Sequence, residues 1–262
     1  MNRIGIIGGS GVYKLEGLKF IEEIKLETDY GKPSSSYKVY ELNNTEYYFL
    51  ARHGDKHTIA PHRINYRANI NGFKKLSVDK IISICAVGGI SDLCKPGTIV
   101  IPDDILDFTS NRESTFFDFG NIFHIDFTEP LCPQLRDTIS KILVDHKIKF
   151  NQRATYVCTN GPRLESPSEI KMFKLLGADI VGMTLMPEAV LAREAELCYA
   201  NVSIVTNYAA GLSAKKLTTL EVKENMNKNK RIVQDVLFEL GNYLIGDLKC
   251  ELCKNALKNT KA

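Results

Sequence analysis

The sequence lacks long hydrophobic runs: no stretch of its 262 residues approaches 18 uninterrupted apolar side chains, so we expect no membrane-spanning helix. It also lacks an excess of either charge, because 34 Lys and Arg against 31 Asp and Glu give a formal net charge of +3. Lysines are scattered, and Phe and Tyr do not interleave with Arg, which argues against a nucleic-acid-binding face. The opening MNRIGIIGGSG has neither the long apolar segment nor the cleavage site of a signal peptide. We therefore expect a cytoplasmic protein.

Cysteine is plentiful, but its spacing gives little support for a metal site. Five of the seven cysteines lie in dispersed apolar contexts that favour buried free thiols: Cys85, Cys94, Cys132, Cys158 and Cys198. Cys250 and Cys253 form a C-x-x-C near the C-terminus, with no second pair or His pair at zinc-binding spacing. A disulfide or free thiols are therefore favoured over zinc there, and Cys132 and Cys198 are another candidate pair. Because cytosolic disulfides are unusual outside hyperthermophiles, the redox state stays open.

Short apolar, β-branched runs alternate with helical patterns along the chain. Strands are predicted at residues 4–7, 47–51, 80–86, 98–101, 155–159, 179–183 and 202–206. Helices are predicted at residues 62–76, 133–147, 167–176, 187–197 and 219–245. The clearest helix start is the capping box Ser166-Pro167-Ser168-Glu169, and Gly177 ends that helix. We therefore predict an α/β fold, a single domain over residues 1–262 with a mixed central β-sheet flanked by helices and a C-terminal tail at about 246–262.

A glycine-rich turn follows the first predicted strand, in the stretch RIGIIGGSGVY at residues 3–13. Its glycines allow the backbone to approach a ligand closely, and such a ligand is usually a phosphate. The spacing Gly5-x-x-Gly8-Gly9-x-Gly11 fits the dinucleotide fingerprint poorly, and no Lys-Ser or Lys-Thr follows as an ATP-binding P-loop requires. A free phosphate ion and a purely structural tight turn are the two interpretations left open by this stretch alone.

Polar residues follow several predicted strands, and the carboxyl ends of strands form the ligand site in such folds. Ser10 has a hydroxyl inside the glycine turn, whose N–H groups can form a concavity for anions. Arg52 follows an apolar strand and can bind an oxyanion with its forked donors. Thr184 lies just before a predicted helix, where anions are favoured. Taken singly, these residues also have structural interpretations: a surface salt bridge for Arg52, a helix cap for Thr184, and a satisfied structural histidine for His53 and His57.

Several long motifs resemble those of the methylthioadenosine and purine nucleoside phosphorylase family: IGIIGGSG, ARHGDKHTIAPHRINYRANI, AVGGI, NGPRLESPSEI and GADIVGMTLMPEAVLAREAELCYA. The resemblance runs from residue 4 to about residue 240. It implies a pentosyltransferase of purine salvage that uses phosphate to split a purine nucleoside into base and sugar 1-phosphate, with no cofactor and no metal. It also implies that the glycine turn binds inorganic phosphate, and that the chain forms a homotrimer or a dimer of trimers.

The resemblance also assigns residues to the two substrates. Phosphate is assigned to Ser10, Arg52, His53, Cys85, Ala86 and Thr184. Because related enzymes often have Thr where this chain has Cys85 and a thiol donates weakly, the backbone N–H of Ala86 is the firmer contact of that pair. Met183 is expected against the ribose, and His57 and Leu220 at the 5′ substituent. Further contacts with the nucleoside are assigned to Leu164, Glu165, Asn207, Tyr208 and Ala209.

Two of these residues predict which purine is bound, because 6-oxo- and 6-aminopurines present different hydrogen-bonding edges. Where methylthioadenosine phosphorylases have an Asp, this chain has Asn207, whose amide N–H groups can donate to N7 and O6. Glu165 stands where those enzymes often have Ser and 6-oxopurine enzymes have Glu, and its carboxylate can accept the N1 proton. Ala209 replaces a second Asp of the aminopurine enzymes. Each mismatch with adenine costs about 1–3 kcal/mol, so two discriminate by roughly a hundredfold or more.

The predicted reaction places phosphate on the face of the sugar opposite the base. As the glycosidic bond lengthens, Asn207 binds the charge that develops on the purine and Glu165 fixes the base, so these are the predicted catalytic residues. The main alternative keeps 5′-methylthioadenosine as the substrate. A nucleotide-binding oxidoreductase and a non-catalytic binding module are rivals from other classes. The identity of the 5′ substituent stays open, because His57 suits a hydroxyl whereas an apolar lining with Leu220 suits a methylthio group.

Overall fold

The computed structural model describes the chain except for residues 1, 13–14, 16, 214–218 and 245–249, and gives only the backbone of 219–221, 223 and 230. The strands are β1 (Asn2–Gly8), β2 (Lys19–Ile24), β3 (Tyr37–Leu42), β4 (Thr45–Ala51), β5 (Lys80–Gly89), β6 (Ile99–Ile101), β7 (Asp104–Phe108), β8 (Phe150–Gln152), β9 (Thr155–Thr159), β10 (Ile180–Gly182) and β11 (Cys198–Tyr208). The helices are η1 (Pro61–Arg63), α1 (Tyr66–Lys75), α2 (Pro133–Asp145), α3 (Pro167–Leu175), α4 (Leu185–Glu194), α5 (Thr219–Tyr243) and α6 (Glu251–Lys254). None of the helices described is long and apolar enough to cross a membrane.

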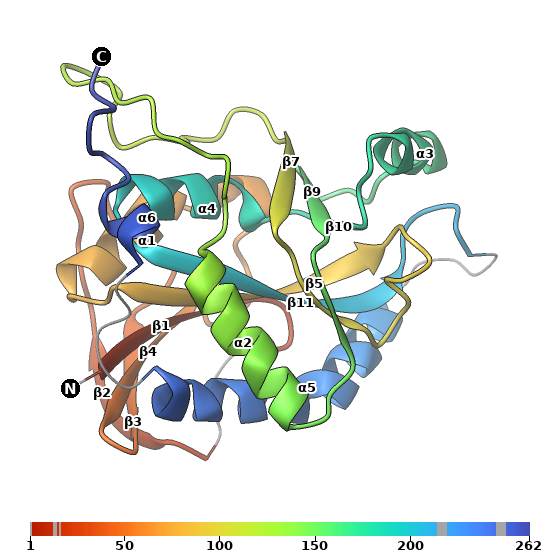
Figure 1. Cartoon of the computed structure of the whole chain (residues 1–262), viewed down its shortest axis with the longest axis horizontal. Helices are drawn as coiled ribbons and strands as arrows, with labels where there is room; N and C mark the ends of the chain where they lie inside the picture. Colours follow the sequence, from red (N-terminus) through yellow and green to blue (C-terminus); the bar gives the residue numbers. More distant parts are fainter. Residues whose placement is uncertain (1, 13–14, 16, 214–218, 245–249) are drawn as a thin grey trace.

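The described strands form one mixed sheet, which crosses the centre of the molecule (Figure 1). Its main path is β2-β3-β4-β1-β5-β10-β9-β7, while β11 pairs with β5 and β6, and β6 pairs with β8. Strands β4, β1, β5 and β11 are parallel to their neighbours in this group, and β10 runs antiparallel to the end of β5. The predicted fold class, an α/β fold with a mixed central sheet, is confirmed.

The parallel register brings the carboxyl ends of four strands to one edge of the sheet. Gly8 at the end of β1 lies opposite Ala51 at the end of β4. On the other side, Asn207 near the end of β11 lies opposite Gly88 near the end of β5. The segments that follow these strands therefore begin side by side, although they are far apart in the sequence.

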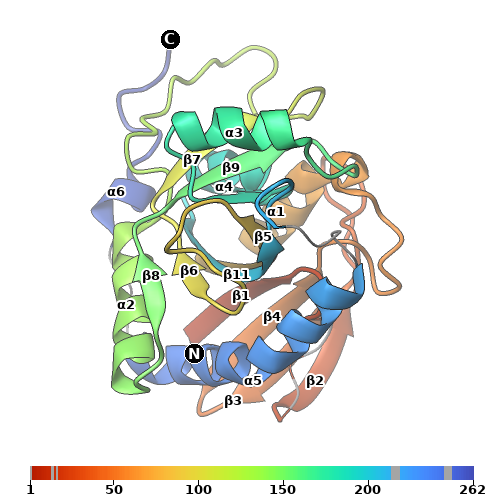
Figure 2. The same cartoon turned by 90° about the vertical axis from the view of Figure 1, so that its right-hand side faces the viewer.

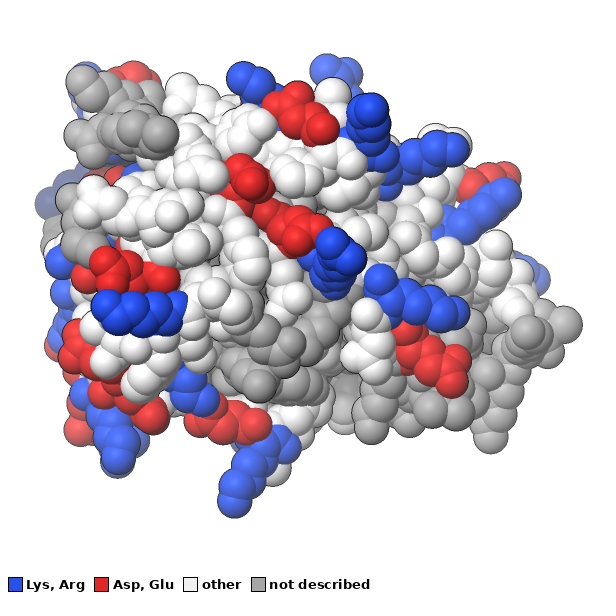
Figure 3. Space-filling model, turned by 90° about the horizontal axis from the view of Figure 1, so that it is seen from below, with Lys and Arg blue, Asp and Glu red and all other residues white. Residues whose placement is uncertain are grey.

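Helices cover both faces of the sheet (Figures 1 and 2). One face packs against α2 and α5, through residues such as Leu135, Ile139 and Leu240. The other face packs against α1 and α4, through residues such as Phe73 and Leu191. On the face seen from below in Figure 3, basic and acidic side chains are interspersed among uncharged ones.

Local sequence signals explain where the helices begin and end. The Ser166 hydroxyl accepts from the backbone N–H of Glu169, and the Glu169 carboxylate accepts from the N–H of Ser166, so α3 begins with the predicted capping box. The N–H of Gly177, which has φ +87°, donates to the carbonyl of Lys174 after the end of that helix. Helix α1 begins at Asn65, whose side chain accepts from the N–H of Ala68.

Four strands were not predicted from the sequence: β2, β3, β7 and β8. The predicted C-terminal tail also contains structure, because its short helix α6 places the Cys253 side chain in the interior at 1% exposure. Beyond α6, Lys261 forms a β-bridge with Phe123, and the N–H of His124 donates to the carbonyl of Thr260 over 2.8 Å. The end of the chain is therefore packed against the core and against the loop before α2.

Candidate active site

A cavity of about 500 Å³ lies at the edge of the sheet where β1, β4, β5 and β11 end. It is bounded by residues of β5 and β11, by the segments that follow β1 and β4, by the segment before α4 and by the loop between β9 and α3. Of the residues predicted from the sequence, the following line it: Ser10, Arg52, His53, His57, Cys85, Ala86, Leu164, Glu165, Met183, Thr184, Asn207 and Ala209. Tyr208 does not line the cavity. Leu220 lies in the first turn of α5, and its side chain is outside the described residues.

The glycine turn after β1 forms one wall of the cavity and places Ser10 there. The N–H of Val12 donates to the carbonyl of Gly9 over 3.1 Å, which closes the turn, and Gly11 has φ +88°. A Cβ at Gly9 would lie 2.4 Å from the carbonyl oxygen of Ile84 and 2.7 Å from Nη1 of Arg52. Glycine is therefore required at this turn so that β5 and Arg52 can approach the backbone.

Arg52 is buried in the wall of the cavity and is held by Glu188, a residue that the sequence did not single out. Arg52 is 1% exposed and Glu188 is 0% exposed. Arg52 Nε and Nη2 donate to the two carboxylate oxygens of Glu188 over 2.5 and 3.0 Å, and Nη1 donates to the carbonyl of Ile84 over 2.9 Å. These bonds use three of the five guanidinium N–H groups, so two can donate to an anion in the cavity. Burial lowers the pKa of Arg52, but the Glu188 carboxylate outweighs it and raises that pKa well above its usual value.

Glu188 is itself held by a buried polar network beneath the cavity. The Tyr199 hydroxyl donates to Glu188 Oε2 over 2.8 Å and lies 2.7 Å from Ser83 Oγ. Asn201 Nδ2 donates to Ser83 Oγ over 2.8 Å, and the Ser203 hydroxyl donates to Asn201 Oδ1 over 2.6 Å. Because every member is fixed by its neighbours, the position of Arg52 is set before any ligand binds.

His53 lines the cavity as a neutral ring. Burial, and next the charge of Arg52, lower the pKa of His53 from 6.5 to about 4. Its Nδ1 lies 2.8 Å from the carbonyl oxygen of Ile59, and because a carbonyl only accepts, Nδ1 carries the proton. The His57 ring packs against His53 with 4.6 Å between the ring centroids. His53 therefore adds no positive charge to the cavity near neutral pH.

Thr184 precedes α4 as its N-cap, but its hydroxyl makes no capping hydrogen bond. Thr184 Oγ1 lies 3.4 Å from Cys85 Sγ, which also accepts from Asn201 Nδ2 over 3.2 Å. The ordinary capping role that the sequence also allowed is therefore not the one observed. Thr184 and Cys85 instead present a hydroxyl and a thiol to the cavity beside Arg52.

A β-bulge aims two consecutive residues of β11 into the cavity. The register of β11 on β5 shifts between Val205 and Asn207, so Thr206 and Asn207 both line the cavity instead of pointing to opposite faces. The Thr206 hydroxyl donates to Asn207 Oδ1 over 2.8 Å, and Asn207 Nδ2 donates to the carbonyl of Tyr208 over 2.9 Å. The amide orientation is thus fixed, and one N–H of Nδ2 is left for a ligand.

Glu165 reaches the cavity from the loop between β9 and α3. It is half-buried, and its Oε1 accepts from the hydroxyl of Thr159 over 2.7 Å. The neighbouring acid, Glu169, instead closes the capping box and pairs with Arg163 over 2.7 Å. Glu165 therefore takes no part in capping α3, and its carboxylate can accept from a ligand.

Arg112, from the segment after β7, connects the segment that carries Met183 with the loop that follows β9. This residue was not predicted from the sequence. Arg112 Nη1 donates to the carbonyl of Met183 over 2.9 Å, and Nη2 donates to the carbonyl of Asn160 over 2.9 Å. A Cβ at Gly161 would lie 2.5 Å from Met183 Sδ, so the loop carrying Glu165 passes directly over Met183. Nothing in the local sequence around Arg112 marks this role, because its partners are backbone carbonyls of distant segments.

Comparisons with known proteins show which chains this one is similar to. Residues 3–240 match the family described as the phosphorylase superfamily. The chain is 48% identical to the probable S-methyl-5′-thioinosine phosphorylase of Thermodesulfovibrio yellowstonii, covering 98% of this chain and 96% of the relative. It is 45% identical to the 6-oxopurine nucleoside phosphorylase of Pyrococcus furiosus, covering 98% of each chain. Among solved structures, methylthioadenosine phosphorylase from Schistosoma mansoni in complex with adenine superposes with a TM-score of 0.95 at 29% identity, covering 100% of this chain and 99% of that chain.

Proposed function

The chain belongs to the phosphorylase superfamily, and on that premise we propose that it catalyses the phosphorolysis of 6-oxopurine nucleosides. The substrates are inosine, guanosine or 5′-methylthioinosine together with inorganic phosphate. The products are the free purine and ribose 1-phosphate or its 5-methylthio derivative. The observation that carries this proposal is that anion donors around Arg52 and the base-reading pair Asn207 and Glu165 line one cavity. The relatives named for 6-oxopurine and methylthioinosine substrates, at 45–48% identity, support it.

Phosphate binds at the end of the cavity formed by Ser10, Arg52 and Thr184. Two N–H groups of Arg52 and the hydroxyls of Ser10 and Thr184 donate to the phosphate oxygens. The ion pair with Glu188 holds the Arg52 guanidinium in place even when no anion is bound. The guanidinium therefore needs no rearrangement when phosphate binds. The glycine turn contributes to this pre-organised anion site, because it brings Ser10 beside Arg52.

The base binds between Asn207 and Glu165. The single N–H left on Asn207 Nδ2 donates to N7, with O6 adjacent to it, and Glu165 accepts from N1–H. Adenine presents a bare acceptor at N1, which would face the Glu165 carboxylate lone pair to lone pair. Leaving such buried groups unpaired costs about 1–3 kcal/mol for each mismatch. At the N7 edge, the Asn207 N–H meets the O6 acceptor of a 6-oxopurine where adenine has a 6-amino donor, so both edges favour the 6-oxopurine.

The reaction is a displacement at C1′ of the sugar. A phosphate oxygen forms a bond to C1′ as the C1′–N9 bond breaks, and the electron pair of that bond goes to the purine. The sugar becomes oxocarbenium-like, and negative charge grows on the imidazole ring and O6 of the base. The hydrogen bond from Asn207 to N7 strengthens as that charge develops, so it lowers the barrier instead of merely binding the substrate.

The oligomeric state and the cytoplasmic location stay predictions: a homotrimer or a dimer of trimers, working in purine salvage. The 5′ substituent meets His57 on one side and Val222 of α5 on another, since both line the cavity. Val222 was not predicted, but it lies two residues from the predicted Leu220 and is an apolar neighbour for a methylthio group.

Steady-state phosphorolysis of four nucleosides tests the proposal. We expect phosphate-dependent base release with kcat/KM for inosine, guanosine and 5′-methylthioinosine at least about a hundredfold above that for 5′-methylthioadenosine. The ratio of kcat/KM for inosine to kcat/KM for 5′-methylthioinosine then shows whether the 5′ pocket prefers a hydroxyl or a methylthio group. A preference for methylthioadenosine would overturn the base assignment, and base release without phosphate would overturn phosphorolysis itself.

A further inference from the structure

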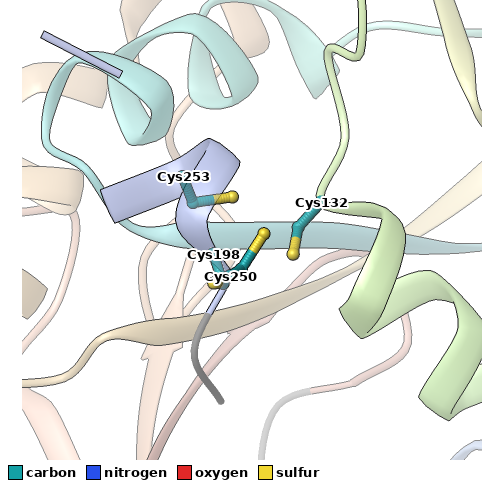
Figure 4. Close-up of side chains that lie close together, drawn as sticks. All are labelled: Cys132, Cys198, Cys250 and Cys253. Carbon is teal, nitrogen blue, oxygen red and sulfur yellow. The ribbon is translucent and has the colours of Figure 1, made fainter. Parts of the chain in front are cut away.

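Four cysteines from three distant parts of the sequence meet at one point, at the opposite end of β11 from the cavity. This Cys cluster consists of Cys132, Cys198, Cys250 and Cys253, all buried, with the four sulfur atoms within 4.8 Å of one another. Cys132 immediately precedes α2, Cys198 begins β11, Cys250 precedes α6 and Cys253 lies within α6. Figure 4 shows the four side chains converging from these elements. The sequence did not predict the cluster, because only two of its members lie at metal-binding spacing.

The arrangement matches a tetrahedral metal site better than two disulfides. Zinc bound by four thiolates has Zn–S distances of about 2.3 Å, which places the sulfurs at the corners of a tetrahedron with edges of roughly 3.8 Å. A disulfide requires only two sulfurs, about 2.0 Å apart, and gives no reason for a second pair to meet the first. All four cysteines are free thiols in the structure, and they gather as one group.

A buried guanidinium lies beside the Cys cluster. Arg193 is 3% exposed, and its Nη1 lies 3.8 Å from Cys253 Sγ while also donating to the carbonyl of Leu252 over 3.3 Å. A buried guanidinium aimed at sulfur offsets the negative charge of a tetrathiolate, as outer partners of metal ligands commonly do. The surroundings of the cluster therefore suit a negatively charged group of thiolates.

We propose that the Cys cluster binds one zinc ion through its four sulfurs and so fastens the C-terminal segment to the core. Binding of Zn²⁺ to the four thiols releases four protons and leaves a tetrathiolate site with two net negative charges. All four ligands come from the protein and are buried, so no position is open for water or substrate, which is the pattern of a structural site.

The site is separate from the cavity. Cys198 and Thr206 lie at opposite ends of β11, and eight residues of extended strand span roughly 26 Å. Zinc at the Cys cluster therefore contributes to stability and takes no part in phosphorolysis. It joins α2, β11 and α6, three elements that are remote in the sequence, so its loss frees the C-terminal segment first.

Metal content and cobalt spectroscopy of the full-length protein test this proposal. Protein purified under reducing conditions with zinc present is expected to contain about one zinc per chain. Replacement by Co²⁺ is expected to give the intense visible bands of a tetrahedral site together with sulfur-to-cobalt charge-transfer absorption. A reduced, metal-free chain that fails to bind Zn²⁺ at micromolar concentration would overturn the proposal, as would a purified chain whose mass shows two disulfides.

Matched cysteine variants locate the ion. Cys253→Ser is expected to weaken zinc binding at least a hundredfold, whereas Cys94→Ser, at a buried cysteine outside the cluster, is expected to retain one zinc per chain. Addition of Zn²⁺ is expected to raise the Tm of metal-free wild type and of Cys94→Ser, but not of Cys253→Ser. If Cys253→Ser does not fold, the zinc titration and cobalt spectrum of the wild-type chain decide the question alone. Equal zinc content in Cys253→Ser and Cys94→Ser would contradict the assignment.

Discussion

The two ends of the cavity are built in different ways. At the phosphate end, Arg52 and Glu188 form an ion pair with exposures of 1% and 0%, fixed by strands and helix α4. At the base end, Glu165 is half-buried on a loop, next to Leu164, which is 53% exposed. The phosphate end is thus part of the buried core, whereas one of the two base-binding residues, Glu165, lies on a surface loop. Changes at the phosphate end are expected to affect folding and catalysis together, and changes at Glu165 to affect catalysis alone.

Removing Arg52 is the change with the largest expected effect. Arg52→Ala leaves the Glu188 carboxylate buried and unpaired, so the free energy of unfolding is expected to fall by about 3–5 kcal/mol. The loss of the pre-organised anion donors is expected to lower kcat/KM by at least about 10²–10³-fold. Urea unfolding and steady-state kinetics measure the two effects.

The matched control for Arg52→Ala is Lys19→Ala, which breaks an exposed pair with Glu41. That change is expected to alter stability by less than about 1 kcal/mol and to leave activity unchanged. Equal destabilisation by the two variants would show that the phosphate end is not built on its buried ion pair.

The pH dependence of the free energy of unfolding tests whether folded His53 is neutral. Below its unfolded pKa of 6.5 the unfolded chain takes up a proton there, while folded His53 stays neutral until about pH 4. The free energy of unfolding is therefore expected to fall by about 3 kcal/mol more in wild type than in His53→Gln as the pH drops from 6.5 to 4. Denaturant midpoints measured across that range give the difference, and parallel curves for the two proteins would mean that His53 titrates normally.

Glu165→Gln tests the opposite end of the cavity. The neutral amide can present an N–H to N1–H, so kcat/KM for inosine is expected to fall by roughly 10–100-fold. Stability is expected to change by less than about 0.5 kcal/mol, because the side chain is half-buried on a loop. Glu169→Gln, four residues away in the capping box, is the control that should leave activity unchanged. Loss of stability without loss of activity in Glu165→Gln would reverse the contrast between the two ends.

Cys85→Ser is the change with the smallest expected effect. Cys85 Sγ accepts from Asn201 and lies beside Thr184, and a serine hydroxyl can take its place in both contacts. The KM for phosphate is expected to change by less than about threefold, which corresponds to roughly 0.6 kcal/mol. Phosphate titrations at saturating inosine measure it. A much larger change would mean that the thiol itself binds phosphate.

The sequence predicted the elements that have strong local signals. The capping box at Ser166 and the apolar runs before Arg52 and Asn207 predicted elements close to those observed. Strands β2 and β7 were missed because they are largely exposed edge strands, KFIEEI and DILDF, without a continuous apolar run. Their extended conformation depends on pairing with β3 and β9, which no local pattern records.

The sequence also predicted half of the residues that line the cavity, because strand ends in a parallel arrangement share one edge. Glu188 was missed because an acid near the start of a helix is ordinarily solvated, and only the tertiary fold buries it against Arg52. Thr206 was missed because alternation along a strand predicts that neighbouring side chains point apart, and the bulge before Asn207 overrides that rule. The Cys cluster was not predicted because it depends on packing between Cys132, Cys198 and the distant Cys250–Cys253 pair.

The substrate preference of Asn207→Asp tests the central claim most directly. The ratio of kcat/KM for inosine to that for adenosine is measured in wild type, in Asn207→Asp and in Asn160→Asp, whose residue lies on the neighbouring loop outside the cavity. An Asp that carries a proton can donate to N7 and accept from the 6-amino group. We expect the ratio to exceed about 100 in wild type and in Asn160→Asp, and to fall at least about tenfold in Asn207→Asp. An unchanged ratio in Asn207→Asp would contradict the assignment of Asn207 as the residue that reads the base.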